Sequence, residues 1–128
     1  NLGAEMIATS PCLSSLEELD LSENGIGEAG AAALASAPRM QRLRRLELAG
    51  NAVGPTGAKA IAASDGLPAL ERLGLATNRV GVPRLASLNR AGVLLRVGTV
   101  DLSGNALNPG GLGVLLDTAD PPGVRSLD

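Results

Sequence analysis

The chain has 128 residues, a formal net charge of −2 and 45% hydrophobic residues, which predicts one folded domain of ordinary size. It contains no histidine and a single cysteine, Cys12. A histidine-based catalytic triad, an internal disulfide and a cysteine-rich zinc site are therefore excluded within these residues. Phe, Tyr and Trp are absent as well. A core without aromatic side chains suits a thin layer of aliphatic side chains that is repeated along the molecule.

The same composition bears on the setting of the protein. No apolar run approaches the roughly 20 residues that cross a bilayer, and residues 1–5 carry no basic group that would begin a signal peptide. No Asn-x-Ser/Thr acceptor site occurs. With one cysteine, these features favour a cytoplasmic, intracellular protein that does not contact a membrane.

An internal repeat dominates the sequence. Four segments follow the pattern L-x-x-L-x-L-x-x-N, with Val in two of the Leu positions of the last one, and they end at Asn24, Asn51, Asn78 and Asn105. Each asparagine lies 27 residues after the previous one. Apolar residues alternate with polar ones before each asparagine, which predicts a short, half-buried strand. Stacked coils would place these strands in a parallel sheet, with the asparagines as a structural column that satisfies backbone groups of neighbouring coils.

A short helix is predicted after each strand. Residues 31–37 and 58–63 are rich in alanine, the best helix former. Three residues after each asparagine stands a glycine or an asparagine: Gly27, Gly54, Gly81 and Asn108. Because both residue types tolerate positive φ, we expect a left-handed turn at these positions.

The repeat pattern resembles the leucine-rich repeat family, and the extension after the asparagine, as in residues 24–34, is similar to the ribonuclease-inhibitor-like subclass. That subclass includes the sensor arms of NOD-like receptors and the Ran GTPase-activating protein. The resemblance implies an α/β fold, a right-handed solenoid in a horseshoe arc with a parallel concave sheet and short convex helices. We expect one domain over residues 1–128, with repeats at about 16–42, 43–69, 70–96 and 97–123 and partial repeats at 1–15 and 124–128.

A solenoid of this kind presents a long concave surface, so the sequence predicts a protein–protein interaction module that belongs to a larger protein and binds another protein. The candidate contact residues are the polar positions of the strands: Glu17, Glu18, Asp20, Glu23, Arg44, Arg45, Glu47, Glu71, Arg72 and Asp101. We expect no enzyme activity, no cofactor and no metal. The alternative function is that of a regulatory subunit or GTPase activator of the Ran-activating type. Because neither end shows a capping repeat, self-association through the ends is also expected.

Residues 25–30 spell G-x-G-x-x-G between a predicted strand and a predicted helix, which is the spacing of a dinucleotide-binding loop. We favour a repeat turn instead, because the second unit keeps the same register as Asn51-Ala52-Val53-Gly54, without the first glycine. A 27-residue coil is also shorter than a βαβ unit of about 30 residues or more.

Two charged sets allow other functions. A basic cluster, which could bind phosphates, consists of Arg39, Arg42, Arg44 and Arg45. Stacking of the repeats would place Arg44 between Glu17 and Glu71, which predicts cross-strand ion pairs instead. With no aromatic side chain to stack on bases and a net acidic chain, we expect no nucleic-acid binding. An acidic column consists of Asp20, Glu47, Asp101 and Asp128. These carboxylates could bind calcium, but we favour a solvated, exposed face.

Overall fold

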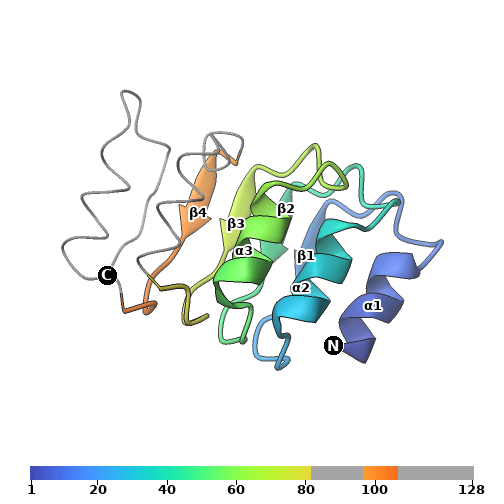
Figure 1. The fold of residues 1–128 in the computed structure, drawn as a ribbon. Coiled ribbons are helices and arrows are strands. Elements are labelled where there is room, and N and C mark those ends of the chain that lie inside the picture. The colour runs from blue at the N-terminus through green and yellow to red at the C-terminus, as the bar shows by residue number, and fades with distance from the viewer. Residues whose placement is uncertain (82–96, 107–128) are drawn as a thin grey trace.

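The computed structural model describes residues 1–81 and 97–106 (Figure 1). Its elements, in chain order, are α1 (Leu2–Thr9), β1 (Glu18–Asp20), α2 (Glu28–Ala35), β2 (Arg45–Glu47), α3 (Gly54–Ala62), β3 (Arg72–Gly74) and β4 (Thr99–Asp101). The predicted repeats 70–96 and 97–123 lie partly outside the described residues, and the partial repeat 124–128 lies outside them altogether.

The strands form one parallel sheet in the order β1-β2-β3-β4, which confirms the predicted parallel sheet. Leu19 pairs with Leu46, Leu46 with Leu73 and Leu73 with Val100, so each residue lies opposite its equivalent in the next segment. Helices α1, α2 and α3 lie side by side over one face of the sheet (Figure 1). We call the opposite face, which carries Glu18, Asp20 and their register partners, the open face.

The core is the layer between the sheet and the helices. Leu46 and Leu73 supply it from the strands, and Leu34 and Ile61 from α2 and α3; each of these side chains is at most 1% exposed. None of the described core residues is aromatic. A core made of such similar aliphatic layers follows from the repeat itself, because each coil adds the same side chains to the same columns.

Glycine and alanine bring the helices close together. A Cβ added to Gly57 of α3 would lie 2.8 Å from the Ala31 Cβ of α2, and one added to Gly30 would lie 3.2 Å from the Ala4 Cβ of α1. Any larger residue at Gly57 would push α3 away from α2. These contacts keep the helix layer compact. None of the described helices is long and apolar enough to cross a membrane.

The helices begin earlier than the sequence predicts, at Glu28 and Gly54 rather than at residues 31 and 58. Alanine content located their interiors but missed their first turns. Those turns are stabilised by an acidic residue in α2 and by Pro55 in α3. The predicted left-handed turn is present at Gly54, with φ of +60°. It is wrong at Gly27, where φ is −93°.

The left-handed residues that recur in every described coil stand immediately before the asparagines. They are Glu23, Gly50, Thr77 and Gly104, all with φ between 53° and 66°. This conformation turns the chain sharply at the strand exit and aims the following asparagine side chain into the coil. Glutamate and threonine adopt it at a cost of about 1 kcal/mol each, which the bonds of the asparagines offset.

Asn51 shows how an asparagine joins two coils. Its Oδ1 accepts hydrogen bonds from the backbone N–H groups of Asn24 and Ile26, at 3.0 and 2.8 Å. Its Nδ2 donates to the carbonyls of Leu21 and Leu48, both at 2.9 Å. One amide therefore satisfies buried backbone groups of its own coil and of the coil before it.

Asn105 repeats this arrangement two coils further along. Its Oδ1 accepts from the N–H groups of Asn78 and Val80, at 2.8 and 3.0 Å. Its Nδ2 donates to the carbonyls of Leu75 and Leu102, at 2.7 and 2.9 Å. The column is an extended hydrogen-bonded ladder along the strand exits.

Replacing Asn78 by alanine should lower the free energy of unfolding by about 2–4 kcal/mol, because it removes bonds from buried groups. Asn78 is 0% exposed, accepts from Val53 N–H at 3.1 Å and donates to the Leu48 carbonyl at 2.7 Å. Asn24 is the matched control, since it is exposed and its Nδ2 donates only within its own turn, to Ser22. Urea denaturation measures both variants, and equal losses would contradict the ladder.

Candidate functional site

The register of the sheet gathers six of the predicted contact residues on the open face. One column runs through Glu18, Arg45, Arg72 and Thr99, and a second runs through Asp20, Glu47, Gly74 and Asp101. These positions flank the central residue of each strand, which is buried in β2, β3 and β4 and half-buried in β1. The alternation of a strand therefore places them on the face opposite the core.

The remaining predicted residues lie beside these columns. Glu17, Arg44 and Glu71 directly precede the strands and are joined by backbone bonds, with Arg44 N–H donating to Glu17 at 2.7 Å and Glu71 N–H to Arg44 at 2.9 Å. Glu23 lies apart from them, in the left-handed turn after β1, where its carboxylate stands beside Gly50 of the next coil. Nine of the predicted residues are thus brought together, and Glu23 lies at their border.

Ion pairs neutralise part of the basic cluster. Arg45 Nε donates to Glu47 Oε1 at 3.0 Å, and an Arg45 Nη1 lies 3.9 Å from Glu18 Oε2. Arg44 Nε lies 3.9 Å from Glu71 Oε1, and among the described residues it makes no ion pair with Glu17. The predicted cross-strand pairing of Arg44 is therefore confirmed on one side only. Such exposed pairs contribute a few tenths of a kcal/mol each.

Asp20 is held in its charged form by hydrogen bonds within its own turn. Its Oδ1 accepts hydrogen bonds from the Ser22 hydroxyl at 2.7 Å and from the Ser22 N–H at 2.9 Å. These bonds, with a smaller contribution from the charge of Arg45, hold the pKa of Asp20 below its ordinary value of 3.8. Asp20 is therefore ionised throughout the neutral range, so the open face carries a fixed negative charge over β1.

Asp20, Glu47 and Asp101, the described members of the acidic column, do not gather into a cage, and Asp128 lies outside the described residues. Within residues 1–81 and 97–106, no three His, Cys, Asp or Glu side chains lie close enough together to hold a metal ion. Glu47 bonds to Arg45 and Asp101 to the Ser103 N–H, so these carboxylates already have donors within the chain. The arrangement suits recognition of a charged surface better than capture of a hard cation.

Gly74 interrupts this column and opens a hollow that sequence reasoning did not foresee. The hollow has a volume of about 230 Å³ and is lined by residues of β2, β3 and β4. Its only signal in the sequence is a glycine at a position where the other units carry Asp or Glu. A second hollow of about 280 Å³ lies before the strands, between Glu17, Arg42 and Arg44.

The G-x-G-x-x-G segment serves the coil rather than a nucleotide. Asn1 Oδ1 accepts the N–H groups of Gly27 at 2.9 Å and Gly30 at 3.2 Å. These are the amides at the start of α2 that a phosphate group would need. Ile26, between the glycines, is 4% exposed and belongs to the core. The structure thus supports the repeat-turn interpretation of this segment.

The comparison with known families agrees with this architecture. Residues 12–35 and 40–62 match the family model described as Leucine Rich repeat. These two segments of the chain are similar to leucine-rich repeats. The two matches cover β1 with α2 and β2 with α3, the coils joined through Asn51. Leucine-rich repeat domains generally mediate protein–protein interaction through their extended surfaces. No curated protein matches the chain.

Replacing Ser22 by alanine should raise the pKa of Asp20 towards its ordinary value, because it removes the hydroxyl that bonds the carboxylate most strongly. The backbone N–H bond of residue 22 remains, so part of the lowering should persist. A carboxyl-detected NMR titration measures the change. Ser15→Ala, at an exposed site before β1, is the control and should leave the pKa of Asp20 unchanged. An unaltered pKa in Ser22→Ala would contradict the assigned cause.

Proposed function

We propose that this leucine-rich repeat chain is a protein-binding module whose contact surface is the open face of its sheet. The observation that carries the proposal is the separation of roles along each strand. Leu46 and Leu73 hold the core, while the flanking Arg45 and Arg72 are exposed. The helices cover the other face (Figure 1). The exposed side chains are therefore free to match a partner without a cost to the fold.

The acidic end of the open face favours a partner with a basic patch. Glu17, Glu18, Asp20 and Glu23 lie in or beside β1 and are all exposed. Among the described residues, only Glu18 of these four makes an ion pair, and that pair spans 3.9 Å. Complementary charge would increase the rate of association and fix the orientation of the partner.

The finer features of the fold belong to the same proposal. We propose a right-handed solenoid of the ribonuclease-inhibitor-like subclass, with the open face concave, in an intracellular protein. Register partners 27 residues apart and a helix after each of β1 and β2 support that subclass. No observation on the described residues favours the Ran-activating alternative.

A double variant, Glu17→Lys with Asp20→Lys, should abolish partner capture. Immobilised wild-type chain and variants would be exposed to a cell lysate, and bound proteins would be identified by mass spectrometry. Lys59→Glu is the control, because Lys59 is an exposed charge on α3, on the helix side. Proteins kept by Lys59→Glu and lost by the double variant would support the proposal. The reverse pattern would place the contact surface on the helices and contradict it.

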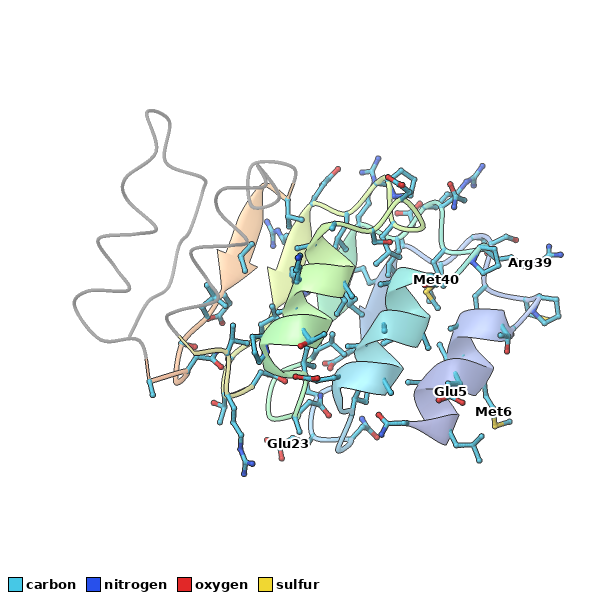
Figure 2. The ribbon with its side chains drawn as sticks, in the orientation of Figure 1. Glu5, Met6, Glu23, Arg39 and Met40 are labelled. Carbon is cyan, nitrogen blue, oxygen red and sulfur yellow. The ribbon has the colours of Figure 1, made fainter. Side chains whose placement is uncertain are left out.

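A second proposal concerns two large apolar side chains that α1 exposes, Leu2 and Met6. Leu2 is 71% and Met6 66% exposed, and Met6 points away from the other elements (Figure 2). Leu19 of β1 is half-buried, whereas its register partner Leu46 is 0% exposed. We propose that a second copy of the chain covers this end, because Leu2, Met6 and the half-buried Leu19 leave apolar side chains accessible there.

Met6→Lys should weaken this self-association by tenfold or more, since burying a methionine contributes about 1.5–3 kcal/mol. Sedimentation velocity over a range of concentrations would measure the mass. Thr56→Lys, an exposed site on α3, is the control and should behave as the wild type. A wild-type chain that stays monomeric at every concentration would contradict the proposal.

A further inference from the structure

The hollow above Gly74 is the feature of the open face that the proposed function leaves unassigned. The other described strands carry a carboxylate at this register position, and glycine supplies no side chain there. A Cβ at Gly74 would collide with the carboxylate of Glu47, which leans over it. The rim of the hollow consists of Arg45, Glu47, Arg72, Thr99 and Asp101.

Arg72 differs from the other charged groups at this rim. Arg45 is bonded to Glu47 at 3.0 Å, and Asp101 Oδ1 accepts the Ser103 N–H at 2.9 Å. Across the described part of the chain, no carboxylate lies within ion-pair distance of Arg72.

Within the described residues, the neighbouring strand β4 offers Arg72 no carboxylate at the paired position. Arg72 pairs in register with Thr99 of β4. Arg45, by contrast, pairs with the acidic Glu18 of β1. Threonine brings a hydroxyl instead of a charge. An exposed guanidinium and a hydroxyl thus stand side by side, next to a hollow of about 230 Å³.

We propose that this hollow receives an aspartate or glutamate side chain of the partner protein, and that Arg72 binds its carboxylate. The inference rests on the proposed role of the open face. The planar guanidinium fork matches a carboxylate in a bidentate manner, and the Thr99 hydroxyl can donate a further hydrogen bond. Because Arg72 makes no ion pair among the described residues, its guanidinium is available to one carboxylate of a partner. Glu47 and Asp101 on the same rim disfavour a doubly charged phosphate group.

The absence of a side chain at Gly74 is then a determinant of specificity. A larger residue would fill the hollow and displace the Glu47 carboxylate, which would keep the partner's acidic side chain away from Arg72. The open face would thus recognise two charges of opposite sign, a basic group over β1 and an acidic one over β3.

A random peptide library displayed on phage would test this inference with the chain of 128 residues. Peptides selected on the wild type would be sorted by NMR, according to whether they change the chemical shifts of the backbone amides of β2, β3 and β4. Those that do should contain an Asp or Glu whose replacement by Asn or Gln weakens binding about tenfold or more, the usual size of a lost charge-assisted hydrogen bond.

Variants of the chain provide the second arm. Arg72→Ala and Gly74→Ser should each weaken these peptides about tenfold, the first by removing the charge and the second by filling the hollow. Arg39→Ala is the matched control, because Arg39 is an exposed arginine that lies far from the sheet (Figure 2), and it should bind as the wild type does. If Arg72→Ala fails to fold, Gly74→Ser and the peptide replacements decide the question.

The possible failures are distinct. Peptides that shift the open-face amides but need no acidic residue, or that bind Arg72→Ala as tightly as the wild type, would overturn this inference and leave the proposed function standing. If the selected peptides shifted only amides of α1, α2 or α3, both proposals would fall.

Discussion

The hydrogen bonds of the asparagine column are the interaction on which the rest of the structure depends. A strand of three residues cannot satisfy the backbone of the coil that follows it, and the turn after each strand would leave polar groups buried. Asn51 and Asn105 fill that role from inside the turn, each bonding groups in two coils. Each asparagine side-chain amide forms its hydrogen bonds only if the neighbouring coil lies at a fixed distance and position. The asparagine column therefore also fixes the register of the strands in the sheet.

Two consequences follow from that register. Equivalent leucines form aliphatic layers, and Gly30 and Gly57 let the helices approach closely enough to cover them. On the other face, equivalent polar residues form columns whose charges the fold does not constrain. The core is therefore determined by side chains that recur in every repeat. The open face is determined by positions that differ between repeats, such as Gly74 in a column of carboxylates. We expect recognition of a partner to depend on those positions.

The sequence predicted the features that periodicity controls. The strands, their parallel order and the column of asparagines follow from equal spacing, because one register relates every pair. Features that depend on single residues were harder to predict. The first turns of α2 and α3 and the extended φ of Gly27 depend on local capping, which alanine content does not report. Whether Arg44 pairs with Glu17 or Glu71 depends on side-chain rotamers, and the hollow at Gly74 depends on where the Glu47 carboxylate leans.

The central claim is that buried asparagine amides join successive coils, and hydrogen exchange followed by NMR tests it most directly. The backbone amides of Ile26 and Val80 bond to asparagine oxygens, at 2.8 and 3.0 Å, and not to any strand. The account predicts that both exchange as slowly as the Leu46 amide at the centre of β2, and that the side-chain amides of Asn51 and Asn105 are protected with them. If Ile26 and Val80 exchanged as fast as the exposed side-chain amide of Asn24, the column would not hold the coils together.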